Sequence, residues 1–377
     1  MSGFPDWVRS AAEHLAAKDS REAVLVGFDG FLDSIIHVVD ERQSATEFTR
    51  IDRMADLGKR ISDAAGKSTN IELVVDHVKL GGNGPIFANA LSQFGHQLSY
   101  IGAIGGAAGT AEGSVHPVFQ DFASRCHRVV PLAPPAATDA LEFNDGKVML
   151  GKMIPLNDVS FDNLLKQLPR EELVEMLKVT GLIGFVNWTM LPYMNSLFEG
   201  FADCFAELEA RPYVFIDLAD PAKRTREDLR EGLAMLSKLQ SQAEVIFGMN
   251  ESESIQVADV LGIQLESNEA RAAEIRASLD ISITCIHPTR SASAASADGA
   301  WTIPGPFSEH PVLTTGAGDV FNSGFCHGLI EGLSPFQALA CGVSASGFYV
   351  RNGESASEAQ LIDFMHAWAE AGCVSPY

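Results

Sequence analysis

The chain has few basic residues, and this shortage excludes several classes of partner. Its 377 residues include 27 Lys and Arg against 49 Asp and Glu, a formal net charge of −22, with no run rich in Lys or Arg. Nucleic acid and anionic membranes repel such a protein, so we expect neither as a partner. No apolar stretch is long and clean enough to span a bilayer. An anionic substrate would have to be held locally, by backbone amides, a metal ion or a few side chains.

Cysteine is also scarce. The six cysteines are scattered along the chain and none forms a Cys-x-x-Cys pair, which predicts free thiols in a reducing compartment. The first residues do not show a charged start followed by an apolar run. Instead, the positions at helical spacing predict an amphipathic helix with its apolar face formed by Trp7, Val8, Ala11, Ala12 and Leu15. We therefore expect a cytoplasmic protein.

Two common nucleotide-binding motifs are incomplete. Ala65–Thr69 ends like a P-loop, but Ile61 stands where that pattern needs its other glycine, and the preceding residues are polar. We interpret this stretch as a solvated loop. Gly102–Gly113 is rich in glycine but lacks the G-x-G-x-x-G spacing of a dinucleotide-binding turn.

Short apolar runs alternate with helical segments along much of the chain. Near-continuous apolar runs are typical of strands that are buried on both faces. They occur at Ala23–Phe28, Leu98–Gly105, Gly181–Trp188, Tyr213–Ala219, Glu244–Asn250 and Ile281–Ile286. Helices are predicted between them, for example at Ala88–Phe94, Glu171–Leu177, Asn195–Leu208 and Arg226–Leu239. This alternation predicts an α/β fold with a mainly parallel sheet between two helix layers, which binds ligands at the carboxyl ends of its strands.

Three segments interrupt the alternation, because they look like strands without crossover helices. They are residues 34–44, 70–80 and 138–153, and the last contains the hairpin signal Asn144-Asp145-Gly146. We expect a small antiparallel sheet apart from the main one. Residues 45–70 are predicted to form a helix and a mobile loop, and Ser291–Ala300 a surface loop or hairpin.

A glycine-rich turn leads into a helix at Thr314–Asp319, which reads TTGAGD. Glycine allows a tight turn and a close approach of the backbone to a ligand, and helix N-termini bind anions. The amides of Gly316, Ala317 and Gly318 would then cradle a phosphoryl group, while Asp319 takes a proton from a substrate hydroxyl. An aspartate whose only role is to stabilise the helix N-terminus by its negative charge would give the same sequence pattern.

Together with three other segments, this turn resembles the PfkB carbohydrate kinase family, which has the ribokinase-like fold. Leu313–Phe325 matches the family's D-T-x-G-A-G-D signature at six of seven positions, and Gly81–Gly95 has the frame of its Gly-Gly signature. Phe247–Ser254 supplies the family's Asn-x-x-Glu, and Val26–Ile36 supplies the aspartate that follows the first strand. The order and separation of the segments agree, so the resemblance covers residues 23–360.

The resemblance implies a single ribokinase-like kinase domain over residues 1–377, a three-layer α/β/α sandwich with a small β-sheet lid. The lid would comprise segments 34–44, 70–80 and 138–153. The implied activity is that of a phosphotransferase with an alcohol acceptor, which moves the γ-phosphate of Mg-ATP to a hydroxyl of a carbohydrate. The partners would be a small sugar, ATP and a second copy of the chain that pairs through the lid.

The same resemblance implies roles for particular residues. Asp319 would be the base, beside the anion hole formed by Gly316, Ala317 and Gly318. The sugar would be held by Asp33, with Asp29 as the second choice, together with Gly81, Gly82 and Asn83. The nucleotide would be bound by Asn250, Glu253, Thr314 and Thr315. Asn250 and Glu253 would also organise Mg²⁺ through water molecules.

The chain departs from the family pattern at a few positions. Leu313 replaces the first aspartate of the signature, beside the family's monovalent-cation site, which leaves activation by K⁺ open. Ile86 replaces an asparagine that usually contacts the sugar, so Asn83 or Asn89 would have to compensate. In Thr284–Ala294, which replaces a glycine-containing turn, His287 and Arg290 would either touch nucleotide phosphates or lie at the surface.

Two other functions are compatible with these motifs. A nucleoside kinase of the same fold would stack its base on aromatic side chains near the lid, where Phe31, Phe48 and Phe143 could equally form lid core. The second alternative is a non-catalytic sugar- or nucleotide-binding protein, in which Leu313 and Ile86 would reflect the loss of catalytic function. The presence of Asp319 together with Asn250 and Glu253 argues against this second alternative.

Overall fold

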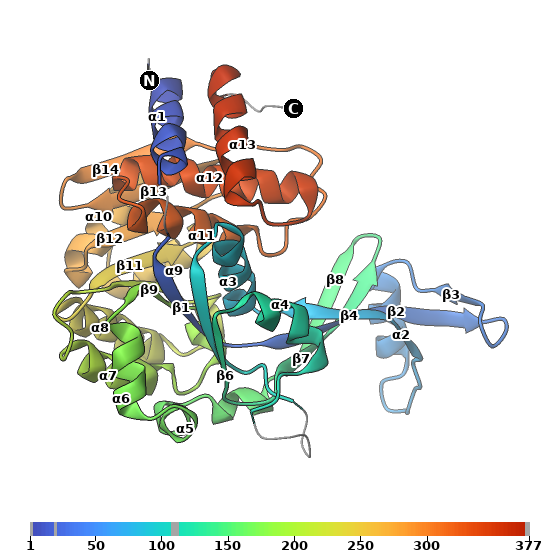
Figure 1. Cartoon of the computed structure of the whole chain (residues 1–377). Helices are drawn as coiled ribbons and strands as arrows, with labels where there is room; N and C mark the ends of the chain where they lie inside the picture. The colour runs from blue at the N-terminus through green and yellow to red at the C-terminus, as the bar shows by residue number, and fades with distance from the viewer. Residues whose placement is uncertain (1–2, 19–20, 107–112, 374–377) are drawn as a thin grey trace.

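The computed structural model describes residues 3–18, 21–106 and 113–373. It contains a nine-stranded sheet in the main body and a separate five-stranded sheet that extends from one side (Figure 1). The main sheet is mostly parallel and lies between two layers of helices. The predicted α/β class, with a small additional sheet, is confirmed.

The main sheet has the strand order β14-β13-β12-β11-β10-β9-β1-β5-β6. All neighbours from β12 to β6 are parallel, and β13 and β14 add an antiparallel hairpin at one edge. The strands are β1 (Ala23–Phe28), β5 (Gln97–Gly102), β6 (Arg128–Pro131), β9 (Thr180–Phe185), β10 (Tyr213–Asp217), β11 (Glu244–Met249), β12 (Ile283–Ile286), β13 (Ser291–Ser296) and β14 (Gly299–Pro304).

The two helix layers bury opposite faces of these strands, because successive side chains of a strand point to opposite sides. On β1, Val24 and Val26 belong to one core and Leu25 to the other. The first core includes α1 (Phe4–Ala16), α3 (Asn83–Gln93), α4 (Gln120–Arg125), α11 (Ala317–Ile330), α12 (Pro335–Asn352) and α13 (Glu358–Glu370). The second includes α5 (Phe161–Gln167), α6 (Arg170–Leu177), α7 (Met194–Phe205), α8 (Arg226–Gln240), α9 (Glu251–Leu261) and α10 (Asn268–Leu279).

The predicted N-terminal helix is present as α1, with one difference. Val8, Ala11, Ala12 and Leu15 are completely buried, whereas the side chain of Trp7 is 53% exposed. The inclusion of Trp7 in the buried face was therefore wrong. Its ring packs edge-on against Phe336 of α12, at the margin of the contact.

The smaller sheet consists of β2 (Phe31–Arg42), β3 (Phe48–Arg50), β4 (Leu73–Gly81), β7 (Ala136–Phe143) and β8 (Gly146–Lys152). The expectation that it is antiparallel was wrong for one pair, because β2 and β7 are parallel. Both strands leave the same edge of the main sheet, after β1 and β6, and so run in the same direction. The segment between β2 and β4 contains α2 (Met54–Asp63), as predicted, and also the short strand β3, which was not.

Ser291–Ala300 is a hairpin, formed by the whole of β13 and the start of β14. It is not a surface loop, because Ala292, Ser293 and Ala294 are buried beneath neighbouring helices. The apparent P-loop ending at Ala65–Thr69 is an exposed turn after α2, as predicted. All six cysteines are free thiols. None of the helices in the described ranges has the length and apolar character to cross a membrane.

Candidate active site

The candidate residues lie at the carboxyl ends of β1, β10 and β11 and at the first turns of α3, α9 and α11. Segments distant in sequence meet there because the carboxyl ends of parallel strands share one edge of the sheet. The smaller sheet joins the main body at the same edge, since β2 follows β1 almost directly.

The turn before α11 has the geometry of an anion-binding helix start. Gly316 caps the helix in the left-handed region, with φ 87°, and the backbone there packs closely. A Cβ atom on Gly316 would lie 3.1 Å from the Tyr349 hydroxyl, and one on Gly318 would lie 3.2 Å from Cε1 of His287. The hydroxyl of Tyr349 donates a 2.8 Å hydrogen bond to the Thr315 carbonyl, which holds the segment that leads into the turn.

Asp319 is buried in the first turn of α11 and contacts α3. Its carboxylate accepts hydrogen bonds from Nδ2 of Asn83 at 3.0 and 3.3 Å. The pKa of Asp319 is raised to about 8, mainly by burial; the Asn83 hydrogen bond lowers it, and the nearby carboxylates of Asp29 and Glu253 raise it. A carboxylate with this pKa can accept and release a proton near neutral pH, as a general base must.

Asp29 connects three elements at the end of β1. Its carboxylate accepts hydrogen bonds from the backbone N–H groups of Asn83 and Gly84, at 3.1 and 2.8 Å, and from Nδ2 of Asn187, at 2.7 Å. Burial raises its pKa to about 6, although these donors lower it. Because Asp29 is fully buried and its carboxylate is occupied by protein donors, it organises the start of α3.

Asp33 lies on β2 and is only partly buried. In the smaller sheet it stands opposite Lys79 on β4 and Thr138 on β7. Its carboxylate packs against Gly81, where a Cβ atom would come within 2.6 Å of both carboxylate oxygens. Burial raises the pKa of Asp33, whereas Lys79 and the Thr138 hydrogen bond lower it. Asp33 is therefore the more accessible of the two predicted sugar-binding aspartates.

Asn250 and Glu253 form a capping box at the start of α9. Oδ1 of Asn250 accepts from the Glu253 N–H at 2.9 Å, and the Glu253 carboxylate accepts from the Asn250 N–H at 2.8 Å. The other Glu253 oxygen accepts from the N–H of Asp220 at 2.9 Å. Glu253 is buried, which raises its pKa, so it is not a solvated acid at the helix start.

Asp217, at the end of β10, was not among the predicted site residues. It accepts hydrogen bonds from the Ala219 N–H and from Nδ2 of Asn322, at 2.8 and 2.9 Å. Burial and the nearby carboxylates of Glu253 and Asp319 raise its pKa well above the usual range. In the sequence, the available signal for Asp217 was an acidic residue at the end of an apolar run. Asn187, which donates to Asp29, follows the apolar strand β9 in a similar way and was also missed.

Asp217, Glu253 and Asp319 fit a divalent cation, because they offer hard oxygen donors with mutually repelling charges. Mg²⁺ prefers oxygen ligands and keeps several of its waters. The protein partners of these three carboxylates are side-chain amides and backbone N–H groups, which supply no full positive charge.

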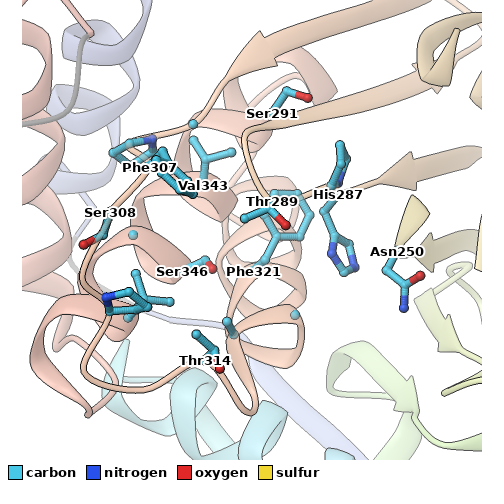
Figure 2. Close-up of a pocket in the computed structure, with 18 of the residues that line it drawn as sticks. Asn250, His287, Thr289, Ser291, Phe307, Ser308, Thr314, Phe321, Val343 and Ser346 are labelled. Carbon is cyan, nitrogen blue, oxygen red and sulfur yellow. The ribbon is translucent and has the colours of Figure 1, made fainter. Parts of the chain in front are cut away.

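A cavity of about 620 Å³ opens beside the α11 turn (Figure 2). Of the predicted nucleotide and anion-hole residues, it is lined by Asn250, Thr314, Ala317 and Gly318. Glu253, Thr315 and Gly316 lie outside this lining. Further lining residues come from α11, α12 and the segments after β12 and β14, and include His287, Phe307, Phe321, Val343 and Ser346.

His287 and Arg290 have different surroundings, and only His287 lines this cavity. The imidazole of His287 packs against Phe321, with ring centroids 4.7 Å apart, and its buried Nε2 has no hydrogen-bond partner among the residues that the structure describes. Burial lowers its pKa to about 4, so the ring is neutral and able to donate one hydrogen bond. Arg290 is exposed, and its guanidinium stacks on Phe307 at 3.6 Å.

The remaining candidates are placed as follows. Asn89 bonds to Arg125 on the surface, so Asn83 is the asparagine at the site. Ile86 packs against Gly316, and Leu313 is partly buried against the first core. Phe31 and Phe143 are buried core residues, whereas Phe48 is half-buried and lies beneath Arg42.

Comparisons with known proteins agree with this geometry. The model of the prokaryotic ketohexokinase family matches residues 5–368. A ketohexokinase of Haloferax volcanii is 26% identical over 367 residues, which cover 96% of this chain and 95% of that protein.

Solved structures of low identity show the fold alone. Thermotoga maritima ribokinase is 16% identical, with a TM-score of 0.59 and coverage of 91% of this chain and 99% of that one. Arabidopsis thaliana ribokinase, in complex with ribose and ATP, is 13% identical, with a TM-score of 0.60 and coverage of 92% and 99%. Trypanosoma brucei adenosine kinase is 17% identical, with a TM-score of 0.62 and coverage of 89% and 100%. On the match over residues 5–368, the chain belongs to the prokaryotic ketohexokinase family and is a PfkB-type sugar kinase.

Proposed function

We propose that this kinase transfers the γ-phosphate of ATP to a hydroxyl of a ketohexose such as fructose. The observation that carries the proposal is the contact between Asn83 and Asp319. It joins the start of α3, beside the expected sugar site, to the anion-binding turn of α11. The name of the Haloferax volcanii relative supports a ketohexose as the acceptor.

The sugar would lie between the smaller sheet and the start of α3. Asp33 would accept hydrogen bonds from its hydroxyls, and the backbone at Gly81 and Gly82 would approach it closely. Gly82 has a φ of 106°, which a larger residue adopts only with strain. Asn83 would hold Asp319 in the orientation in which its carboxylate takes the proton of the reacting hydroxyl.

The phosphoryl group would lie at the N-terminus of α11. The amides of Gly316, Ala317 and Gly318 would stabilise the charge on its oxygens, and the helix dipole would add to this effect. Asn250, Thr314, Thr315 and the Nε2 donor of His287 would bind the remaining phosphates. In phosphoryl transfer such positioning and charge stabilisation supply most of the catalysis.

Mg²⁺ would be held by Asp217 and Glu253, together with Asn250, through its water molecules. Bound there, it would supply neutralisation of the phosphate charge. Glu253 would act while keeping its hydrogen bonds to the backbone at Asn250 and Asp220, which fix the carboxylate in place. Asp217 is thus added to the metal site that the sequence predicts from Asn250 and Glu253.

The smaller sheet would act as a lid of the single kinase domain and exclude water from the transfer. It exposes apolar side chains on β4 and β8, namely Leu73, Val75, Val78, Met149 and Leu150. A second copy of the chain that pairs through the lids would cover them. Light scattering of the purified protein should give twice the 40.5 kDa of one chain. A mass of one chain at micromolar concentration would contradict the homodimer.

The acceptor is tested by ADP release from Mg-ATP over a substrate panel. The panel contains fructose, tagatose, ribose, 2-keto-3-deoxygluconate, myo-inositol, fructose phosphates, adenosine and inosine, each with and without K⁺. We expect fructose to react fastest. Faster reaction of adenosine or inosine would favour a nucleoside kinase. Sugar binding without transfer to any acceptor would favour a non-catalytic protein. The comparison of rates with and without K⁺ shows whether the chain lacks the monovalent-cation site because Leu313 replaces the aspartate.

Asp319→Asn should reduce kcat by about 10²–10⁴, the scale of a lost general base. The same variant should be more stable than the wild type, because an amide avoids the cost of burying a charge. Since folding raises the pKa of this group from 3.8 to about 8, its contribution to stability falls as the pH rises through that interval. The stability advantage of the Asn variant should therefore grow from pH 4 to pH 8.

Steady-state kinetics and thermal unfolding measure the two effects. Asp56→Asn is the matched control, because Asp56 lies in the first turn of α2 and is exposed. It should change neither quantity. A rate for Asp319→Asn close to that of the wild type would remove Asp319 from its role as base.

The pH dependence of kcat/KM should show the titration of Asp319. Only the ionised carboxylate accepts a proton, so kcat/KM should rise with pH and reach half its plateau at about pH 8. Because the Asn83 hydrogen bond lowers this pKa, Asn83→Ala should move the midpoint to higher pH. A profile that is flat between pH 6 and pH 9, or an unchanged midpoint in Asn83→Ala, would contradict the assignment.

A further inference from the structure

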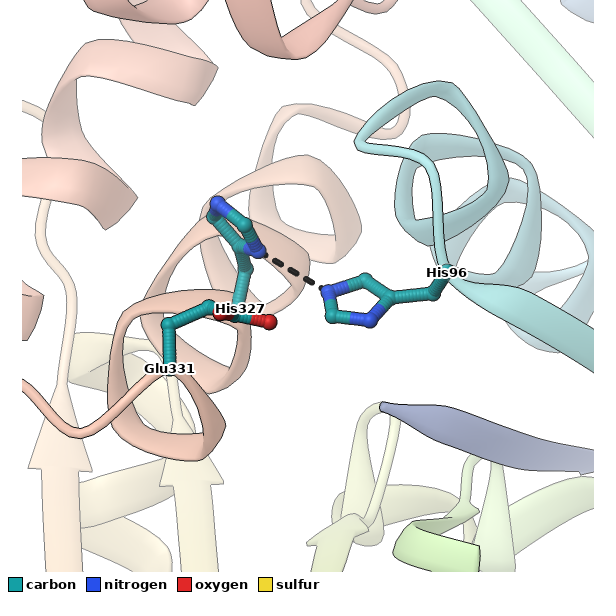
Figure 3. A group of neighbouring side chains, drawn as sticks. All are labelled: His96, His327 and Glu331. Atoms are coloured by element: carbon teal, nitrogen blue, oxygen red, sulfur yellow. Dashed lines mark hydrogen bonds between the residues drawn. The ribbon is translucent and has the colours of Figure 1, made fainter. Parts of the chain in front are cut away.

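Away from the active site, two histidines and a glutamate form a buried cluster. His96 follows the end of α3, His327 lies in the last turn of α11, and Glu331 comes directly after that helix (Figure 3). One potential ligand atom from each lies within 4.8 Å of the others. All three residues are at most 5% exposed. The mechanism proposed above uses none of them.

The contacts of the two imidazoles restrict where their protons lie. Nδ1 of His96 lies 3.1 Å from the carbonyl oxygen of Glu22, which can only accept, so Nδ1 carries a hydrogen. In the neutral ring, Nε2 of His96 therefore presents a lone pair to Nδ1 of His327, 2.9 Å away. Nε2 of His327 lies 3.4 Å from the Glu358 carboxylate and forms no hydrogen bond with the described residues.

Either a hydrogen or a metal ion can occupy the place between the two inner nitrogens. A hydrogen on Nδ1 of His327 would satisfy the pair. It would leave Oε1 of Glu331, which is buried and accepts no hydrogen bond from the described part of the chain. Oε2 of the same carboxylate faces Arg21 at 3.6 Å. A cation bound by both inner nitrogens and Oε1 would satisfy all three atoms, and the unpartnered oxygen therefore favours the metal.

We propose that Nε2 of His96, Nδ1 of His327 and Oε1 of Glu331 bind a divalent transition-metal ion of the Zn²⁺ type. Two imidazoles and a carboxylate are typical ligands of Zn²⁺, and water supplies the fourth tetrahedral position. One outer contact also matches, because metal-bound histidines usually donate their other N–H to a carbonyl or a carboxylate. The Glu22 carbonyl fills this role for His96, and the Glu358 carboxylate lies 3.4 Å from Nε2 of His327.

The two nitrogens of the cluster require only a small adjustment, whereas the Glu331 oxygen, within 4.8 Å of them, has to come into coordination distance of the same ion. Zn–N bonds of about 2.0–2.1 Å in a tetrahedron place two nitrogens about 3.3 Å apart, so the rings must separate by a few tenths of an ångström. Burial lowers the pKa of His96 to about 3, which keeps this ring neutral and ready to bind a metal. The charge of the ion meets the carboxylates of Glu331 and Glu358, while Arg21 balances part of their charge.

The position of the site indicates a structural role. His327 lies eight residues after Asp319 on the same helix, about 12 Å along its axis at 1.5 Å per residue. The starts of α3 and α11 meet in the contact between Asn83 and Asp319, and the ion would join the other ends of the same two helices. Binding should therefore stabilise the fold without contributing a group to the reaction, whatever the acceptor is.

The test uses the full-length protein without a histidine tag, stripped with a chelator and titrated with Zn²⁺. We expect one ion per chain by elemental analysis and a melting temperature that rises with the Zn²⁺ concentration. Glu331→Gln, which keeps the shape of the side chain, and His327→Gln should bind at least about tenfold more weakly, the minimum loss seen even for outer-shell changes. His77→Gln is the control, because His77 is exposed on β4 and should not affect the binding.

Co²⁺ provides a second measurement that needs no variant. The wild-type protein loaded with Co²⁺ should show the visible absorption bands of a four- or five-coordinate site. Equal Zn²⁺ binding by the wild type and Glu331→Gln, or its loss in His77→Gln, would overturn the proposal. So would ring ¹⁵N NMR that shows both nitrogens of His327 protonated in the presence of equimolar Zn²⁺, because a proton would then occupy the place of the metal.

Discussion

The arrangement of the site depends on Asn83, which bonds to two buried carboxylates at once. Its backbone N–H donates to Asp29 at the end of β1, and its side chain donates to Asp319 at the start of α11. Asn187 adds β9 to the same network through Asp29. Two strands and two helices that are far apart in sequence are thereby held in one geometry. The expected sugar site and the expected phosphate site lie on either side of this asparagine.

Burial of several acidic side chains at one edge of the sheet costs folding free energy and also enables these groups to exchange protons. Asp29, Asp217, Glu253 and Asp319 have raised pKa values because they are desolvated and repel one another. The two large cores on either side of the sheet offset this cost. In the proposed function, a chain with a net charge of −22 would therefore rely on helix N-termini, side-chain amides and a divalent cation to attract phosphate groups.

The position of the smaller sheet follows from the topology of the main one. β2 and β7 both leave the carboxyl edge, after β1 and β6, and the chain returns to the body after β4 and after β8. The sheet is therefore held beside the site by four connections and not by a single hinge. Asp33 lies on β2, and its carboxylate packs against Gly81, at the end of β4. A movement of this sheet relative to the body would move Asp33, a proposed sugar-binding residue, together with the proposed lid.

The sequence alone determined the features that depend on neighbouring residues. Apolar runs defined the strands, 3.6-residue periodicity defined α8 and most of the face of α1, and the TTGAGD turn marked the start of α11. Only the tertiary structure decided the parallel pairing of β2 with β7, the exposure of Trp7 and the participation of Asp217 and Asn187. It also brought His96 to His327, 231 residues away. Backbone preferences and side-chain periodicity act within one element, whereas these contacts depend on strand order and on the face that each helix buries.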